Sequence, residues 1–359
     1  MSLVCPGVSF QMDKPSGWHP YKMPEPPHLT PLDDEQQRPY FESLPDISSH
    51  WMKMKTLMKF PVLLVIVTGS FLGLYVLPDV SQYQSHCPCE ECTLENDPWF
   101  NARVDKSVPV FLTADYQLPE DAYRWWKRIY PRRNRSVYDG LVEEIFKVIP
   151  HHPDVMAAGS KKCAVVGNSV NLKGSLYGQL INSHDVVMRM NAAVIKGFEA
   201  DVGDKTTHHI MYPESSMHLD TKTRLVLFPF KILDLEWLPK ALTTGASRIE
   251  KWSYRAKIRA NKDLVMLVNP AFMRYVHVNW LEKKGNYPST GFMTVVMALH
   301  ICEEVHVFGF GADKEGNWNH YWALNRFKKL KTGAHPGHLE YETIKKLAQL
   351  NIIRFYTGV

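Results

Sequence analysis

Several patterns that mark common enzyme sites are absent from this chain of 359 residues. It contains no Asp-X-Asp, the usual carboxylate clamp for a metal ion bound to a sugar nucleotide, and no Gly-X-Ser-X-Gly of the serine hydrolases. The loop "GNSVNLKG" lacks both the glycine spacing of a dinucleotide fingerprint and the Gly-Lys-Ser/Thr ending of a P-loop. These absences argue against a carboxylate-clamped metal, a hydrolase serine and the two commonest nucleotide motifs.

The chain also lacks a strong charge of either sign. Its 42 Lys and Arg residues face 37 Asp and Glu residues, which gives a net charge of +5, and the basic residues are scattered among the acids. This pattern predicts no nucleic-acid binding, while a mildly basic surface suits an anionic small substrate. The hydrophobic content of 45% can fill the core of one large or two ordinary domains.

Long apolar runs are rare, but residues 60–77 form one of 18 residues without a charge, about the minimum for a membrane-spanning helix. Three lysines (Lys53, Lys55, Lys59) precede it, and the acid-rich "CPCEECTLEND" follows. By the positive-inside rule, we expect a single signal anchor, with residues 1–59 in the cytosol and the rest lumenal. A cleaved signal peptide is the alternative, but the run begins far from residue 1.

The predicted domains follow from this topology. Residues 1–59 are rich in proline and polar residues and are predicted to be a disordered cytosolic tail. Residues 78–115 have little periodicity and are predicted to be a stem, which leaves 116–359 as the lumenal catalytic domain. Met52 and Met54 are alternative starts that the sequence does not decide between.

Cysteine is scarce, with six residues, and all but Cys5 fall in the predicted lumenal part, where disulfides persist. The stem contributes three of them (Cys87, Cys89, Cys92). With Cys163 and Cys302, the predicted lumenal part contains five cysteines. This odd number leaves one thiol without an intramolecular partner. The only glycosylation sequon found is "NRS" at Asn134.

The central and C-terminal parts alternate between short apolar runs and helical stretches. The expected strands are "CAVVG", "DVVMRMN", "THHIMYP", "TRLVLFPF", "DLVMLVNP" and "EVHVFGFGA". Helices are expected in "PEDAYRWWKRIYP", "VYDGLVEEIFKVIP" and "TGFMTVVMALHICEE". This alternation predicts an α/β domain with a mostly parallel sheet flanked by helices, whose ligands bind at the carboxyl ends of the strands.

Polar residues in the expected strand-end loops have two possible roles. Asn168, Asn171 and Asn191 could bind a base, ribose or phosphate through their amides, or they could cap helices and occupy left-handed turns. Ser289 and Thr290 in "YPSTGF" precede a long apolar helix, where they form either an anion site or a plain helix cap.

Histidines are the leading acid/base candidates because imidazole titrates near neutral pH. The stretch "NHYWALNRFKKLKTGAHPGHLE" holds His320, His335 and His338. His208 and His209 are adjacent on an expected strand, so their side chains point to opposite faces and cannot bind one metal ion. The "CPCEEC" stretch could bind a metal, although in a lumenal stem we expect disulfides instead.

Four stretches together resemble the sialylmotifs of the animal sialyltransferases, glycosyltransferase family 29. "CAVVGNSVNLKGSLYGQLINSHDVVMRMNAAVIKGFEADVGDKTTHHIMYPES" resembles the large motif, and "NPAFMRYVHVNWLEKKGNYPSTGFMTVVMALHICEEVHVFGFGADKEGNW" resembles the small one. "HYW" and "HPGHLE" resemble the third and very-small motifs. The resemblance covers residues 87–359 and is greatest to the β-galactoside α-2,3-sialyltransferases that act on Galβ1-3GalNAc.

The resemblance implies a single-pass type II enzyme of the Golgi membrane with a GT-A-like variant of the Rossmann fold. Such an enzyme uses CMP-sialic acid, needs no metal or other cofactor, and inverts the anomeric carbon of sialic acid. It transfers to galactose-terminated glycoproteins or glycolipids. Cys163 and Cys302 occupy the positions of the disulfide between the two large motifs, and Cys87 with Cys92 is a further plausible pair.

The resemblance also implies individual roles. Asn168 and Asn191 are expected to bind CMP, in a nucleotide pocket lined by Tyr287, Ser289, Thr290, Gly291 and Gly311. His320 matches the histidine that contacts the phosphate, and His335 matches the base that takes the proton from galactose O3. His338 has no counterpart.

Two alternatives remain open. Ala323 follows "HYW" where the family typically has an acid, and the loop from His320 to His335 is short. These features are compatible with a catalytically impaired paralogue that binds a glycan or nucleotide, and an unpaired Cys89 would favour a homodimer. The other alternative is the same enzyme with a Galβ1-4GlcNAc acceptor.

Overall fold

The computed structural model describes residues 97–129, 134–152, 161–246, 254–323 and 333–359. Contacts divide the chain into Met1–Pro88 and Cys89–Val359, and all described residues lie in the second unit. The predicted cytosolic tail and membrane anchor, as well as Cys87 and Cys92, lie outside the described residues. Within the described ranges, no helix is long and apolar enough to cross a membrane.

A seven-stranded sheet forms the centre of the second unit, in the order β5-β4-β3-β2-β1-β6-β7. Every neighbouring pair of strands is parallel. The strands are β1 (Lys162–Val166), β2 (Val186–Met190), β3 (His208–Met211), β4 (Arg224–Leu227), β5 (Val265–Leu267), β6 (Glu304–Phe308) and β7 (Arg354–Tyr356). The predicted α/β class with a parallel sheet is confirmed.

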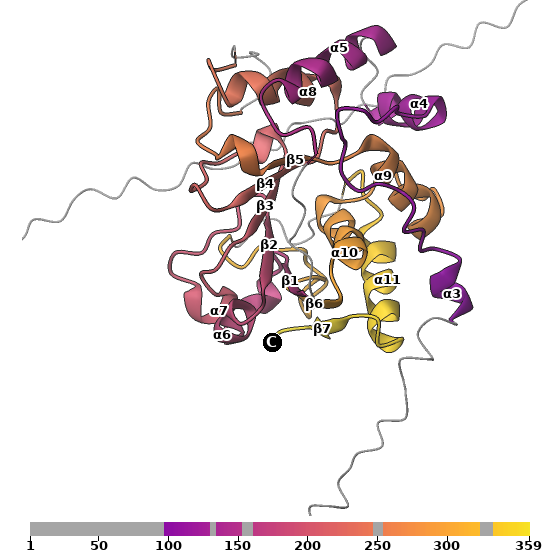
Figure 1. Cartoon of the computed structure of the whole chain (residues 1–359). Coiled ribbons are helices and arrows are strands. Elements are labelled where there is room, and N and C mark those ends of the chain that lie inside the picture. The colour runs from indigo at the N-terminus through magenta and orange to yellow at the C-terminus, as the bar shows by residue number, and fades with distance from the viewer. Residues whose placement is uncertain (1–96, 130–133, 153–160, 247–253, 324–332) are drawn as a thin grey trace, which may run out of the picture. The chain divides into compact units, whose positions relative to one another are not determined.

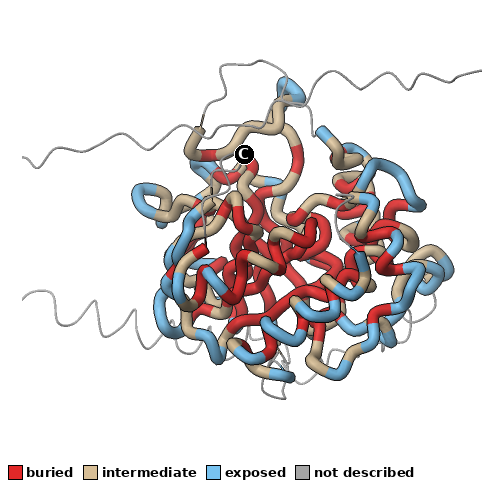
Figure 2. The backbone as a smooth tube through the Cα atoms, turned by 90° about the horizontal axis from the view of Figure 1, so that it is seen from above, coloured by how far each residue is buried: buried red, intermediate tan, exposed pale blue. Residues whose placement is uncertain are grey.

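Helices cover both faces of this sheet (Figure 1). α9 (Pro270–Tyr275), α10 (Thr290–Ile301) and α11 (Gly337–Gln349) lie on one side, and α6 (Gly178–Asn182) and α7 (Glu199–Val202) lie on the other. Alternate side chains of β1 serve the two faces: Cys163 and Val165 join the larger apolar cluster, while Ala164 and Val166 join the smaller one. Buried residues accordingly concentrate on the sheet and the helices that flank it (Figure 2).

The remaining helices lie before β1 or in the connections between strands. They comprise α3 (Pro98–Asn101), α4 (Glu120–Ile129), α5 (Arg135–Phe146), α8 (Ile232–Ala241), the 3-10 helices η2 (Val170–Leu172), η3 (Pro213–Ser215) and η4 (Lys262–Leu264), and the π-helix η5 (Val276–Trp280). α4 and α5 confirm the two helices predicted before the first strand. α4 has acids in its first turn and bases in its last, which suits the helix dipole.

Part of the predicted stem belongs to the packed domain. Val110, Phe111 and Leu112 are buried in the larger apolar cluster. The backbone N–H of Leu112 donates to the carbonyl of Leu267 at 2.8 Å, so this segment lies along the exposed edge of β5. Packed structure therefore begins before residue 116, because these apolar side chains cover a sheet edge that would otherwise face water.

The apolar helix α10 anchors the middle of the sheet. Nearly all its side chains are buried, as expected for a helix that is hydrophobic on every side. Directly after it, Cys302 forms a disulfide with Cys163 of β1, across a sequence separation of 139 residues. This confirms the pairing implied by the resemblance, and a native disulfide typically contributes about 2–4 kcal/mol to the stability of the fold.

Candidate active site

The chain order of the strands reverses between β1 and β6, and in a parallel sheet such a switch point is where ligands bind. The loops after these two strands are hydrogen-bonded together. Ser169 Oγ donates to the carbonyl of Gly311 at 2.9 Å, and the N–H of Val170 donates to the carbonyl of Asn319 at 2.8 Å. The segment that carries His320 is thereby fixed against the loop after β1.

Asn168 lies at this switch point with one half of its amide unsatisfied. Its Nδ2 donates to the carbonyl of Met190, at the end of β2, at 3.0 Å. Its Oδ1 is buried and has no hydrogen-bond partner among the described residues. A buried acceptor without a donor is costly, so this oxygen is suited to receive a hydrogen bond from a ligand. The arrangement fits the predicted nucleotide contact.

Asn171 has a different environment. Its Nδ2 donates to the carbonyl of Ala312 at 3.0 Å, and its own carbonyl accepts from the N–H of Val359 at 3.1 Å. The side chain therefore joins the two switch-point loops, and the backbone holds the C-terminus. These contacts favour the structural role that the sequence had left open over a role in ligand binding.

Asn191 directly follows β2 and adopts the left-handed conformation, with φ of 57°. Its Oδ1 accepts from Ser215 Oγ at 2.9 Å, and its carbonyl accepts from Nε2 of His209 at 2.9 Å. Asparagine tolerates this conformation better than most residues. The turn presents the Asn191 side chain at the carboxyl edge of the sheet, next to the loop after β3.

The "YPSTG" segment caps α10. Ser289 Oγ accepts from the N–H of Phe292 at 3.1 Å, so Ser289 is the N-cap and Thr290 is the first helical residue. Ser289 also gives two hydrogen bonds to Glu340 of α11, from its N–H at 2.7 Å and from its Oγ at 2.6 Å. The cap is therefore tied to the helix that follows His335.

Two glycines in the predicted pocket are closely packed. A Cβ on Gly291 would lie 3.0 Å from Cε1 of Phe310. Gly311 has φ of 101°, and a Cβ there would lie 2.6 Å from the ring of Tyr341. Gly311 therefore needs glycine for its backbone conformation, whereas a side chain at Gly291, in the first turn of α10, would require the ring of Phe310 to shift.

Glu340 was not identified from the sequence, although it ends the "HPGHLE" stretch. It is 6% exposed. Burial raises the pKa of its carboxyl to about 7, against the two hydrogen bonds from Ser289, which lower it. Its importance comes from a pairing with a residue 51 positions earlier, which no local pattern reveals.

The stability contributed by Glu340 should depend on pH. Its folded-state pKa lies above the ordinary value of 4.5, so this stability is fully present below about pH 4.5 and is lost as the pH rises through about 7. Glu340→Gln can keep both contacts with Ser289 but does not ionise, whereas Glu340→Ala loses both at a cost of about 1–3 kcal/mol. Thermal unfolding at pH 5 and pH 8 should show the wild type losing more stability than Glu340→Gln. Identical pH slopes would contradict this account.

His335 is held by Tyr287. Its Nδ1 lies 3.2 Å from the carbonyl of Tyr287, and the two rings meet edge to face with centroids 4.8 Å apart. Since a carbonyl only accepts, this contact selects the tautomer with the proton on Nδ1 and the basic lone pair on Nε2. Burial lowers the pKa of His335, which keeps the imidazole neutral. This is the protonation state that a general base requires.

His320 is oriented by its neighbours in the "HYW" segment. Its ring stacks on that of Trp322 with centroids 4.7 Å apart, and its backbone pairs with Ser169. Burial lowers its pKa as well. The carbonyl of His320 accepts from the N–H of Ala323 at 3.1 Å. His320 therefore lies at the switch point beside the loop after β1.

His338 contrasts with both other histidines. Its side chain is 89% exposed on α11, with Nδ1 4.0 Å from a carboxylate oxygen of Glu342. It has neither the burial nor the fixed orientation of His320 and His335, in agreement with the absence of a counterpart in the motif.

A row of aromatic rings at the carboxyl ends of β3 and β4 leads to His335. Tyr212 packs on Phe230 at 5.6 Å between centroids, and Phe230 packs on Tyr287 at 5.4 Å. The sequence placed ligand binding at the carboxyl ends of the strands, but it did not indicate this row of rings. Its rings come from segments far apart in the sequence, so only the sheet order brings them together.

A buried ionic cluster joins the segments that follow β3 and β4. Lys231 Nζ lies 2.6 Å from Glu214 Oε1 and 2.7 Å from Asp234 Oδ1. Asp234 is fully buried and Lys231 is 9% exposed. Burial raises the pKa of Asp234 to about 6, although the attraction of Lys231 lowers it. The cluster fixes the loop after β3 to the start of α8.

His208 and His209 are buried in β3 and stay neutral. Burial lowers their pKa values to about 3 and about 4 respectively. Nε2 of His209 is used by the carbonyl of Asn191, and Nδ1 of His208 lies 2.9 Å from Oγ1 of Thr207. The described part of the chain contains no group of three or more His, Cys, Asp or Glu side chains placed to hold a metal ion.

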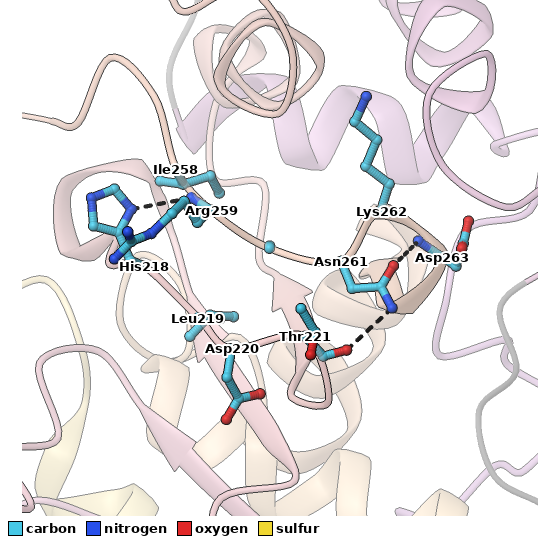
Figure 3. Close-up of a pocket in the computed structure, with 10 residues that line it drawn as sticks. His218, Leu219, Asp220, Thr221, Ile258, Arg259, Asn261, Lys262 and Asp263 are labelled. Carbon is cyan, nitrogen blue, oxygen red and sulfur yellow. Dashed lines mark hydrogen bonds between the residues drawn. The ribbon is translucent and has the colours of Figure 1, made fainter.

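An open hollow lies at the amino ends of the strands, at the end of the sheet opposite to the switch-point loops (Figure 3). It is lined by residues that precede β4 and β5: His218, Leu219, Asp220, Thr221, Ile258, Arg259, Ala260, Asn261, Lys262 and Asp263. In a parallel sheet, the amino ends of all strands lie at one end of the sheet and the carboxyl ends at the other. The hollow is therefore separate from the switch-point loops and from both candidate histidines.

Comparison with known proteins agrees with the motifs. The family model described as glycosyltransferase family 29 (sialyltransferase) matches residues 111–352. The Homo sapiens CMP-N-acetylneuraminate-beta-galactosamide-alpha-2,3-sialyltransferase 1 is 43% identical over 281 residues, or 76% of this chain and 83% of that protein. The Mus musculus CMP-N-acetylneuraminate-beta-galactosamide-alpha-2,3-sialyltransferase 2 is 42% identical over 302 residues, or 82% of this chain and 86% of that protein.

A solved structure also matches. A crystal structure of a mammalian sialyltransferase in complex with Gal-beta-1-3GalNAc-ortho-nitrophenol is 43% identical, with a TM-score of 0.68, and the match covers 73% of this chain and 95% of that one. Motifs, fold and relatives thus agree, and the chain belongs to glycosyltransferase family 29, the sialyltransferases.

Proposed function

We propose that the chain transfers sialic acid from CMP-sialic acid to O3 of the terminal galactose in Galβ1-3GalNAc on O-glycans, with inversion at the anomeric carbon. Glycolipids that end in the same disaccharide are a second acceptor class. The human and mouse relatives are named as β-galactosamide α-2,3-sialyltransferases. The similar crystal structure holds a Galβ1-3GalNAc derivative, which supports this acceptor.

In the proposed mechanism, Nε2 of His335 accepts the proton of the galactose O3 hydroxyl as this oxygen attacks the anomeric carbon. The bond from that carbon to the CMP phosphate breaks, and CMP leaves as an anion. His320 is proposed to stabilise the charge that develops on the phosphate. With a base and a phosphate-binding imidazole both supplied by the chain, we propose that transfer needs no metal.

The observation that carries this proposal is the contact between His335 Nδ1 and the carbonyl of Tyr287 at 3.2 Å. It assigns the basic lone pair to Nε2, and it ties the base to the "YPSTG" segment that caps α10. Asn168 supports the donor side, because its buried Oδ1 lacks a partner among the described residues.

We further propose that the protein is a single-pass type II protein of the Golgi membrane, on the basis of the apolar run and its flanking charges. Asn134 is exposed, and its Oδ1 caps α5 by accepting from the N–H of Val137 at 3.1 Å. A glycan on the amide nitrogen would be compatible with this cap. We also propose that a disulfide between the Cys89 residues of two chains would join them as a homodimer.

The full chain, expressed in membranes and assayed with CMP-sialic acid in EDTA, should sialylate Galβ1-3GalNAc. Galβ1-4GlcNAc serves as the matched alternative acceptor, and we expect it to be a poor one. Preference for Galβ1-4GlcNAc, or strict dependence on added metal, would contradict the proposed acceptor or mechanism. Binding of CMP without transfer to any galactoside would instead support the impaired paralogue suggested by Ala323.

A further inference from the structure

His277 is a buried imidazole that the proposed mechanism does not use. It lies in the π-helix η5, which follows α9 directly. Its Nδ1 accepts from the indole Nε1 of Trp125, in α4, at 2.9 Å. Its Nε2 lies 3.1 Å from the carbonyl of Gly285. π-helical turns are rare and occur often near functional sites. This one places an imidazole between α4 and the segment that leads to "YPSTG".

Both contacts can be made by only one form of the ring. An indole N–H only donates, so Nδ1 of His277 must carry the lone pair. A carbonyl only accepts, so Nε2 must carry the proton. Burial lowers the pKa of His277, and the cations Arg128 and Lys283 act in the same direction, against hydrogen bonds to the backbone carbonyls of Gly285 and Lys284. The neutral Nε2–H tautomer is therefore the form that occupies this position.

Gly285 in turn lies against the segment that carries His335. It has φ of 72°, and a Cβ there would lie 2.6 Å from Cδ of Pro336. The next residue, Asn286, donates its N–H to the carbonyl of Ala334 at 3.0 Å. Tyr287 then accepts from Nδ1 of His335. Residues 285–287 and 334–336 are thus joined side by side, and His277 holds one end of this pairing.

We propose that His277 is a positioning residue for His335: by fixing the carbonyl of Gly285, it sets the place of the segment on which the base rests. This inference rests on the proposed function, because it requires His335 to act as the base. His277 touches neither substrate nor any reacting atom. The contact from Trp125 makes α4, which lies outside the sialylmotifs, part of the support of the active site.

The test compares His277→Leu, His277→Gln and Trp125→Phe in the full chain. A displacement of the base by a fraction of an ångström should lower kcat about tenfold or more in His277→Leu, since catalysis is sensitive to such shifts. The KM for CMP-sialic acid and the affinity for CMP should change less than about twofold. Glutamine can accept from Trp125 and donate to Gly285, so His277→Gln should regain most of the lost kcat.

Trp125→Phe keeps an aromatic ring but removes the indole donor together with part of the ring volume, so it tests the contact with His277 even if His277→Leu folds poorly. Its kcat should fall while CMP affinity is unchanged. An unchanged kcat in folded His277→Leu and Trp125→Phe, beside an inactive His335→Ala, would overturn this inference and leave the proposed function intact. Equal losses in CMP affinity and kcat would also overturn it, because they indicate general damage. Absence of transfer by the wild type would overturn both proposals.

Discussion

His335→Ala is expected to lower kcat for sialyl transfer by about 10²–10⁴-fold, the usual contribution of a positioned general base. Affinity for CMP should persist, because Asn168 and the "YPSTG" segment remain in place. The loss of kcat follows from the fixed orientation of the imidazole. The carbonyl of Tyr287 engages Nδ1, so the variant loses the basic Nε2. Steady-state kinetics with Galβ1-3GalNAc and titration of CMP measure the two quantities.

His338→Ala is the matched control, since His338 lies only three residues further on and is exposed. It should stay within about twofold of the wild type. Wild-type kcat in His335→Ala would show that another group takes the proton. Equal losses in the two variants would show that the loss arises from disturbance of α11.

The pH profile gives the same assignment a second test. Burial lowers the pKa of His335 below its ordinary value of 6.5, although the hydrogen bond to Tyr287 raises it. A protonated imidazole cannot accept the hydroxyl proton, so activity should fall as the pH drops through this lowered pKa. The acid limb of kcat/KM should therefore lie below pH 6.5 in the wild type and be missing from the residual activity of His335→Ala.

Lys231→Met is expected to lower the free energy of unfolding by about 3–5 kcal/mol, because it leaves the carboxylates of Glu214 and Asp234 without their counterion. Asp234 is fully buried, so water cannot replace the ammonium group. The loss should be largest at high pH. As the pH falls, the carboxyl of Asp234, whose pKa burial raises to about 6, binds a proton, and its unpaired charge disappears. Thermal unfolding of the full chain at pH 5 and pH 8 would measure this dependence.

Lys345→Met provides the control for Lys231→Met. Lys345 pairs with Glu342 at 2.7 Å, but both side chains are at least 40% exposed. Such a surface pair contributes about 0–1 kcal/mol, so the variant should unfold close to the wild type. Similar losses at the two lysines would mean that burial does not distinguish these ion pairs. Adding Glu214→Gln and Asp234→Asn to Lys231→Met should recover part of the loss.

Much of the fold was predictable because parallel strands buried on both faces leave a simple signal. The strands from "CAVVG" to "EVHVFGFGA" are apolar runs that end in turn residues. The helices between them indicate crossover connections, which join parallel strands. β7 was not predicted. It has only three residues, at the edge of the sheet, and its side chains are partly exposed, so it carries no comparable apolar pattern.

The site was predictable only in part. His320, His335 and the disulfide came from the resemblance to the sialylmotifs, since spacing alone treated the three histidines of one stretch as equivalent. Asn171 was ambiguous, because an amide that joins two loops looks the same in a sequence as one that binds a ligand. Contacts such as Glu340 with Ser289, or His277 with Gly285, depend on tertiary packing, which periodicity does not encode.

We propose that the chain attaches sialic acid to O3 of galactose. The most direct measurement incubates the full chain with CMP-sialic acid and either Galβ1-3GalNAc or its analogue in which the galactose 3-hydroxyl is replaced by hydrogen, and determines the product linkage by NMR. We predict an α-2,3-linked product from the first acceptor and none from the second. Transfer to the 3-deoxy analogue, or a linkage to another hydroxyl group, would contradict the account.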